Sequence, residues 1–294
     1  MTTVGNVIDR LYALYLEPPD AQPAVALLGP AITDVASSFS IDRFMITEDE
    51  TLMSQGVVVQ IDSELILVGA YDATLKEASL LTRGYQGTVA AAHDASVVVT
   101  LSPSFPRLSA FEAVADNIIT LHPALFTANI VETSTVDGMV APMEDPLAVS
   151  IIEIFAEGAR TDPVSGRIID YHPAVGGRAI IIDRYAGPIW VRYRRRMGKA
   201  TSEADTLVDL GVDERWANIV IVGAAADLLA GRDIPAAQTD WISAGIEAET
   251  IRVGTRASVS TALARYRELL MSRATAEMRN EYRPQVRMRR VFGG

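Results

Sequence analysis

Four stretches of the chain place apolar residues three and four positions apart, the spacing of one helix face. They are residues 4–15, 110–121, 213–229 and 258–281. Small residues interrupt the strongly apolar third stretch, which predicts a helix buried among other elements. Pro284 ends the last stretch, because proline cannot continue a helix.

Short runs rich in branched residues occupy the intervals between these helices and are bounded by glycine, proline and aspartate. One set is 56–61, 64–68, 76–82 and 96–101, and a second set is 129–135, 148–155, 178–183 and 189–194. Short strands with tight turns at this spacing predict a small antiparallel barrel or sandwich. The pair around Asp62-Ser63 predicts a hairpin.

Together these patterns predict an α+β fold, in which antiparallel β domains are attached to a helical core with a long C-terminal helix and an extended C-terminal arm. Six segments are expected along the chain. They are an N-terminal helical segment at 1–40, a small antiparallel β domain at 41–102, a helix at 103–127, a second β-rich region at 128–200, a helical region at 201–282 and the extended arm at 283–294.

Composition narrows the functional classes. The 294 residues include no cysteine, which excludes disulfides, thiolate catalysis and cysteine-based zinc sites. The net charge of −11 gives no general attraction to nucleic acid. The charge is uneven, because residues 273–294 carry six arginines against two glutamates. We expect no signal peptide and no membrane span, since no run approaches about eighteen apolar residues.

Candidate catalytic residues are sparse. His93, His122 and His172 lie far apart and lack the spacing of a metal site, so we expect neither a metal nor another cofactor. Neither a Gly-x-Ser-x-Gly nor a phosphate-binding glycine motif occurs. The carboxylates of residues 48–50 are interpreted as a solvated surface. The sequence favours a protein that is not an enzyme, although a glycosidase pair assembled from distant carboxylates stays open.

One internal basic run, Arg194, Arg195 and Arg196, has two interpretations. It is a solvated strand end, or it contacts an acidic partner or the phosphates of passing DNA. No aromatic residues are interleaved as a stacking platform, so base recognition has no support.

The segment 80–99 carries the most informative motif, Arg-Gly-Tyr-Gln-Gly-Thr followed by a run of small residues and a histidine. Its glycines permit positive φ, so two strands can reverse around a compact corner. The polar side chains of the motif can then hydrogen-bond the free carbonyls and amides of that turn. We therefore expect a structural role rather than a binding role. The residues concerned are Arg83, Gly84, Gly87, Thr88 and His93.

This motif resembles a module that recurs in neck and tail proteins of tailed bacteriophages. The likeness extends over about residues 55–294, through the segment 103–125, the Val-Arg-Tyr-Arg-Arg strand end at 191–195 and the basic C-terminus. It is similar there to head–tail adaptor proteins, the head-to-tail connectors of the phage neck. Residues 1–55 match nothing in that family.

The resemblance implies a structural virion protein, made in the host cytoplasm and placed in the neck between capsid and tail. Such adaptors form a homo-oligomeric ring, typically of twelve copies, that docks on the portal protein and joins it to a stopper or another tail-side neck protein. Genomic DNA passes through the channel during ejection without sequence recognition. The resemblance assigns portal binding to the C-terminal arm, with Arg283, Pro284, Val286, Arg287, Met288, Arg289, Arg290, Val291 and Phe292.

The length of the arm agrees with this assignment, because so short a segment cannot build its own core and becomes ordered by docking. Two alternatives remain. The same module occurs in baseplate and tail-tip proteins. A carbohydrate-binding or carbohydrate-acting β protein is the other alternative, and exposed tryptophans beside paired carboxylates in a groove would support it. The three tryptophans lie in apolar surroundings, which favours burial.

Overall fold

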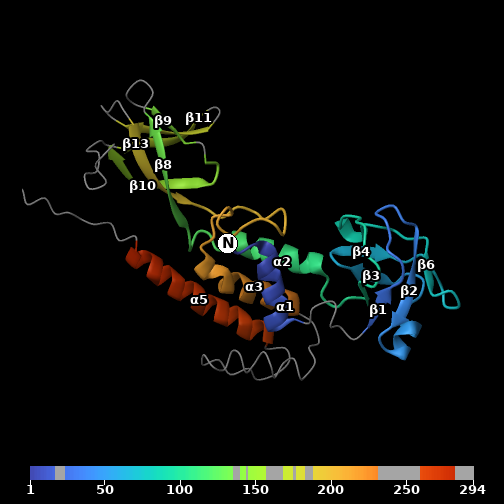
Figure 1. The fold of residues 1–294 in the computed structure, drawn as a ribbon. Helices are drawn as coiled ribbons and strands as arrows, with labels where there is room; N and C mark the ends of the chain where they lie inside the picture. Colours follow the sequence, from blue (N-terminus) through green and yellow to red (C-terminus); the bar gives the residue numbers. More distant parts are fainter. Residues whose placement is uncertain are drawn as a thin grey trace, which may run out of the picture. The chain divides into compact units, whose positions relative to one another are not determined.

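A computed structural model describes residues 1–16, 24–134, 140–143, 145–156, 168–174, 177–182, 188–230 and 259–281. The fold is α+β (Figure 1), which confirms the fold class expected from the sequence. The chain divides into two compact units. Unit 1 consists of residues 1–3, 115–220 and 265–294, and unit 2 of residues 4–114 and 221–264.

Unit 2 contains a seven-stranded antiparallel half-barrel, which we call the β domain (residues 24–102). The strand order in the sheet is β4-β3-β7-β1-β2-β6-β5. The expected hairpin around Asp62-Ser63 is present, since β3 and β4 pair antiparallel with Ile61 opposite Glu64. The strands are β1 (Val25–Leu28), β2 (Ser38–Phe44), β3 (Val58–Ile61), β4 (Glu64–Leu67), β5 (Ala70–Asp72), β6 (Glu77–Ser79) and β7 (Val98–Leu101).

The expected boundary of the β domain at residue 41 was wrong. Strand β1 lies in the middle of the sheet between β7 and β2, and its residues Ala26 and Leu28 are fully buried. Strand β2 also begins within the supposed helical segment 1–40, where α1 is the only helix among the residues that the structure describes. The four residues of β1 are all apolar, although only Ala26 and Leu28 are fully buried, so the alternation of the strand does not appear in the sequence.

The core of the β domain is formed by apolar side chains from the strands of this sheet, together with Met53 and Val68 from the segments that adjoin them. Alternation along each strand turns every second side chain inward, and branched residues fill that side. The buried core residues are Ala26, Leu28, Phe39, Ile41, Met53, Val59, Ile61, Ile66, Val68, Ala78, Val99 and Leu101.

Helix α1 (Val4–Tyr15) precedes the β domain, and α2 (Arg107–Ile119) follows it. The expected helical spacing of α1 is confirmed, because Val4, Val7, Ile8 and Leu11 are fully buried. Within unit 2, the Tyr12 hydroxyl donates to the carbonyl of Phe105 at 2.8 Å, which joins α1 to the start of the segment that leads into α2.

The expected second β-rich region consists of two three-stranded antiparallel sheets, with strand orders β10-β13-β8 and β11-β12-β9. Strands β9 and β11 were not expected from the sequence. The strands of these sheets are β8 (Thr127–Ser134), β9 (Val140–Met143), β10 (Ala148–Ala156), β11 (Ile168–Ala174), β12 (Gly177–Ile182) and β13 (Pro188–Arg195).

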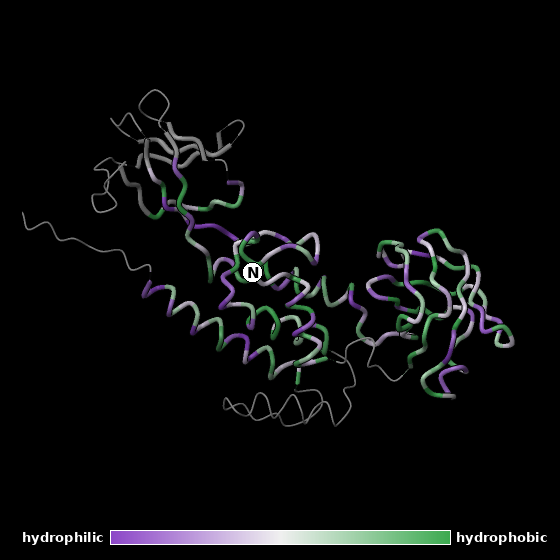
Figure 2. The backbone as a smooth tube through the Cα atoms, in the orientation of Figure 1, coloured by the Kyte–Doolittle hydropathy of each residue, from purple (hydrophilic) through white to green (hydrophobic). Residues whose placement is uncertain are grey.

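Helices α3 (Ala217–Leu229) and α5 (Val259–Glu281) confirm the last two expected helices. Figure 2 shows α3 as almost uniformly hydrophobic, whereas α5 alternates between polar and apolar positions. The described residues also contain three short 3-10 helices, η2 (Thr47–Leu52), η3 (Tyr85–Gly87) and η4 (Glu214–Trp216). In the described part of the chain, no helix is both long enough and apolar enough to cross a bilayer.

Candidate functional site

Glu64, the first residue of β4, is fully buried in the β domain. Its carboxylate accepts hydrogen bonds from Arg83 Nε at 2.7 Å and Arg83 Nη2 at 2.8 Å. The backbone N–H groups of Gly84 and Ala91 each donate to it at 3.0 Å. A buried carboxylate needs this degree of compensation, because removing its charge from water is costly.

The protein holds Glu64 in its ionised form. Burial by itself raises the pKa of a carboxyl group, but the bonds from Arg83, the Ala91 amide, His93 and the Gly84 amide outweigh it. The pKa of Glu64 falls from 4.5 to about 2 as a result. The carboxylate therefore acts as a permanent buried anion around which the surrounding loops are arranged.

The Arg83 guanidinium connects Glu64 to two other loops. Its Nη1 donates to the carbonyl of Thr33 at 2.8 Å, and its Nη2 donates to the carbonyl of Ala91 at 2.6 Å. The planar fork of an arginine can make such bonds in several directions at once. One side chain thus ties together the loop after β1, the segment after β6 and the segment before β7.

His93 lies between two carboxylates. Its Nε2 is 2.9 Å from Glu64 Oε2, and its Nδ1 is 2.8 Å from Asp62 Oδ2. The ring is buried, whereas the Asp62 side chain is 62% exposed. A ring with both protons donates to both carboxylates, and a neutral ring donates to only one. We call Asp62, Glu64, Arg83 and His93 the ion cluster.

The turn that follows Arg83 depends on left-handed backbone. Gly84 has φ 62°, Gln86 has φ 54° and Gly87 has φ 86°. Thr88 fastens the turn, because its hydroxyl accepts from the Leu65 amide at 3.0 Å and donates to the Tyr85 carbonyl at 2.9 Å. All five motif residues predicted from the sequence therefore lie in this one corner of the β domain.

We expect Gly84→Ala to destabilise the β domain more than Gly87→Ala does. Both positions are left-handed, so alanine costs roughly 1 kcal/mol at each. A Cβ at Gly84 would lie 2.8 Å from the Thr88 carbonyl oxygen, whereas nothing lies within 4 Å of one at Gly87. Urea unfolding of both variants, followed by circular dichroism, measures the difference. Equal losses would mean that the corner is not closely packed at Gly84.

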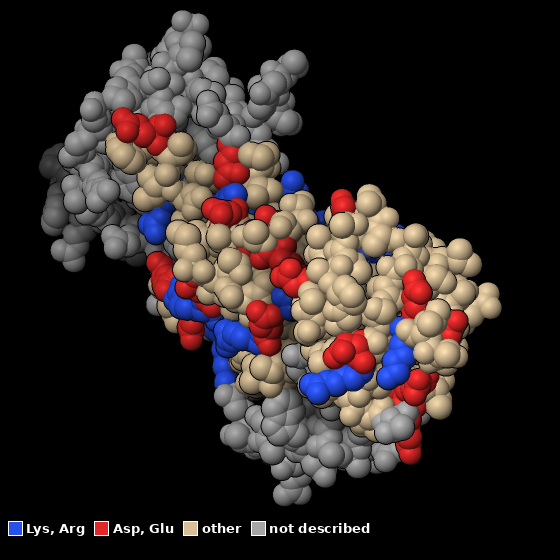
Figure 3. Space-filling view, turned by 45° about the vertical axis from the view of Figure 1, so that its right-hand side comes forward, with Lys and Arg blue, Asp and Glu red and all other residues tan. Residues whose placement is uncertain are grey.

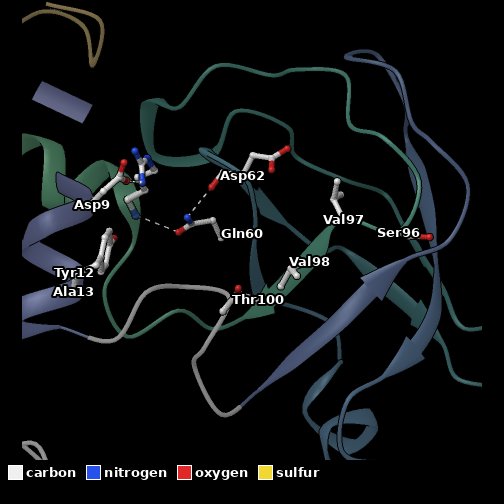
Figure 4. A pocket seen from close by; sticks show the side chains of 10 residues that line it. Asp9, Tyr12, Ala13, Gln60, Asp62, Ser96, Val97, Val98 and Thr100 are labelled. Atoms are coloured by element: carbon white, nitrogen blue, oxygen red, sulfur yellow. Dashed lines mark hydrogen bonds and ion pairs between the residues drawn. The ribbon is translucent and has the colours of Figure 1, made fainter. Parts of the chain in front are cut away.

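A cavity of about 600 Å³ opens beside the ion cluster within unit 2 (Figure 4). The charged side chains around it are paired, since Arg107 Nη1 lies 2.9 Å from Asp9 and Asp62 contacts His93. Gln60, which is buried, forms part of the cavity wall. Its side-chain amide donates from Nε2 to the Asp62 carbonyl at 2.8 Å and accepts at Oε1 from the Arg107 amide at 3.1 Å. Its lining residues are Asp9, Tyr12, Ala13, Gln60, Asp62, Ser96, Val97, Val98, Thr100 and Arg107.

The arginine run is divided between internal and external roles. Arg195 contacts Asp145 at 3.0 Å and donates to the carbonyl of Asp209 at 2.8 Å. Asp145 also accepts from Tyr193, and burial together with this bond raises the pKa of Tyr193 to about 12. Arg194 lies over the Phe126 ring at 4.5 Å and is otherwise exposed, as is Arg196. The predicted partner contact thus concerns Arg194 and Arg196.

Two further expectations concern carboxylates and aromatic residues. Asp49 is not on a solvated surface, because it is 4% exposed and accepts from the Ile46 amide at 3.2 Å. It stabilises the start of η2, a local role that its acidic neighbours conceal in the sequence. Trp216 is buried and Trp190 is half-buried, while Trp241 and His172 lie among residues or side chains that the structure does not describe.

Sequence reasoning missed Glu64 and Asp62, which complete the ion cluster. The available signal was that Glu64 begins the apolar run Leu65-Ile66-Leu67. A charge that an apolar strand carries into the protein interior requires a partner. The predicted portal-binding arm, residues 283–294, lies outside the described residues. Across the described ranges, no group of three or more acidic or histidine side chains is placed to hold a metal ion.

In comparisons with known proteins, no protein-family model and no curated protein sequence matches the chain.

Proposed function

We propose that this chain is a structural subunit of a tailed phage's neck, a head–tail adaptor that assembles into a ring on the portal protein. The observation that carries the proposal is the structural role of residues 83–93, the motif that resembles phage neck and tail proteins. Arg83 and His93 bind Glu64, and Thr88 binds the turn. The motif thus shapes a rigid loop assembly and leaves its polar groups engaged with one another.

A buried ion cluster of this kind is suited to holding loops in place. Arg83 spans loops that are 50 and 8 residues away from it in the chain, at Thr33 and Ala91. A subunit that is packed beside copies of itself needs such loops to keep one shape before assembly, because ordering them on binding would weaken the contact. The non-enzymatic role that we propose requires rigidity at this corner.

The charge of the chain also fits a channel through which DNA moves. A net charge of −11 repels DNA phosphates and disfavours adhesion to the moving duplex. The basic residues of the C-terminal arm, by contrast, are concentrated within a few positions. In the proposed ring, this arm binds the portal and another surface meets the stopper or the next tail-side component.

We expect removal of residues 282–294 to weaken binding of the full-length chain to its portal by on the order of a hundredfold or more. The arm carries four arginines and Phe292, residue types that supply much of the energy of protein interfaces. Removal of Gly293 and Gly294 alone is the matched control and should leave binding unchanged. Biolayer interferometry with immobilised portal measures both truncations.

Equal portal binding by the intact and shortened chains would overturn the arm assignment. Failure of the intact chain to bind portal or to assemble with it would overturn the proposed function itself. Native mass spectrometry of the reconstituted complex reports the number of copies per portal and separates these two results.

A further inference from the structure

Three neighbouring loops of the β domain expose large apolar side chains beside the ion cluster. Val35 is 83% exposed, Leu80 is 74% exposed and Val89 is 80% exposed. The Leu81 amide donates to Ser37 at 3.3 Å, and Ile32 and His93 form a β-bridge, so the loops lie side by side. We call Val35, Leu80 and Val89, together with the exposed residues Asp34 and Asp94, the loop face.

The ion cluster fixes the loops that carry these side chains. Arg83 bonds the carbonyl of Thr33, two residues before Val35, and that of Ala91, two residues after Val89. Leu80 lies three residues before Arg83 and has φ 52°, a backbone conformation that a leucine rarely adopts. Isolated exposed apolar residues need no explanation, but three on rigidly held adjacent loops are typical of an interaction surface.

The loop face carries negative charge. Within residues 30–37 and 80–95, the charged residues besides buried Arg83 are Asp34 and Asp94, and both are exposed. Figure 3 shows acidic and basic side chains interspersed on the described surface that it draws. A partner for the loop face therefore combines apolar side chains with exposed positive charge.

Unit 1 carries a surface of that character at the end of β13. Arg194 is exposed there, and Arg196 follows it and is exposed as well. On the adjacent strand β8, Ala128 lies opposite Arg194, and Ile130, which is 53% exposed, lies two residues further on. Residues i and i+2 of a strand share a face. Glu132 also lies on this face, so Arg194 and Arg196 leave it positive. We call it the arginine face.

We infer that the loop face of one copy binds the arginine face of a second copy. This inference rests on the proposed ring and names the contact that builds it. A ring requires a head-to-tail interface between two different surfaces of each copy. The loop face and the arginine face both expose apolar side chains, and their charges are opposite in sign. Opposite charges on the two sides of such a contact favour the correct neighbour and disfavour pairings of like-charged faces.

Cysteine cross-linking tests the contact directly, because the chain contains no cysteine of its own. The full-length variant Val89→Cys/Ile130→Cys, treated with a short bis-maleimide at high protein concentration, should give a ladder of trimers and larger species. Val89→Cys alone should give dimers at most. In the control Val89→Cys/Leu75→Cys, the second cysteine is also exposed but lies on the β5–β6 turn and belongs to neither face. This control should give no ladder.

A charge exchange confirms the pairing. Asp34→Lys/Asp94→Lys and Arg194→Glu/Arg196→Glu should each reduce the ladder on the order of tenfold or more. An equimolar mixture of the two variants, built on the cross-linking background, should restore it, since alternating copies are again complementary. The exposed pair Asp42→Lys/Glu48→Lys is the control and should leave the ladder unchanged.

Monomers or dimers alone from Val89→Cys/Ile130→Cys would overturn the inference, as would a fast-migrating monomer in which both cysteines belong to one chain. A single chain that carries all four exchanges, Asp34→Lys, Asp94→Lys, Arg194→Glu and Arg196→Glu, is the last comparison. If it restores the ladder and the mixture does not, the contact lies within one chain. If the wild-type chain assembles on its portal but the Val89→Cys/Ile130→Cys variant gives no such ladder, the faces are wrong while the adaptor function stands. If the wild-type chain does not assemble and the variant does not cross-link, both fail.

Discussion

Replacing Glu64 by glutamine is expected to lower the free energy of unfolding of the β domain by about 3–5 kcal/mol, the usual cost of breaking a buried ion pair from one side. The substitution conserves size, removes the charge and replaces one acceptor oxygen with an NH2 group. Arg83, whose side chain is 9% exposed, would then be a buried cation without its anion. The Gly84 amide bonds Oε1 and the Ala91 amide bonds Oε2, so one of them would keep only a weaker neutral acceptor and the other would face an NH2 group that cannot accept.

Tryptophan fluorescence would not report unfolding of the β domain, because the tryptophans of the chain lie outside it. Hydrogen exchange of the backbone amides measures the effect within the domain itself. Amides of β3, β4 and β7 should lose protection in Glu64→Gln. Glu48→Gln changes an exposed glutamate of the same domain and should stay within about 0.5 kcal/mol of the wild type. A loss below about 1 kcal/mol in Glu64→Gln would mean that the ion cluster contributes little to the fold.

Arg83→Lys distinguishes the charge of the cluster from its geometry. Lysine keeps the positive charge near Glu64 but cannot reproduce the planar fork that reaches Thr33 and Ala91 as well. We expect the loops before His93 and after β1 to lose exchange protection even where the sheet retains it. A variant indistinguishable from the wild type would show that the bonds to these carbonyls do not hold the loops.

Acidification should unfold the β domain through the same residue, and this is the second large effect. The folded protein lowers the pKa of Glu64 to about 2 from 4.5. A depressed folded-state pKa means that the unfolded chain binds the proton more readily. The stabilisation is therefore complete above pH 4.5 and is lost as the pH falls toward 2. A shift of this size corresponds to roughly 3 kcal/mol.

Urea midpoints measured at several pH values between 7 and 2 test the sign and the window. Glu64→Gln should be less stable at neutral pH, but its curve should fall less steeply below pH 4.5, so the two proteins converge. Parallel curves for wild type and variant across this window would show that other carboxylates control acid unfolding.

The sequence by itself determined most of the helices and the position of the corner. Regular spacing of apolar residues was sufficient for α1, α3 and α5, because a helix face is set by residues three and four positions apart. The two glycines at positive φ, Gly84 and Gly87, marked the turn for a similarly local reason. These features depend on near neighbours in the chain, which a sequence displays.

Only the tertiary structure decided which segments that are distant in the chain contact one another. Strand β1 belongs to the sheet because β2 and β7 flank it, and its four residues carry no pattern that reveals this. Glu64 is a buried anion because Arg83 and His93, 19 and 29 residues away, fold onto it. The cost of burying a charge is local, whereas its compensation comes from partners that only the folded chain brings together.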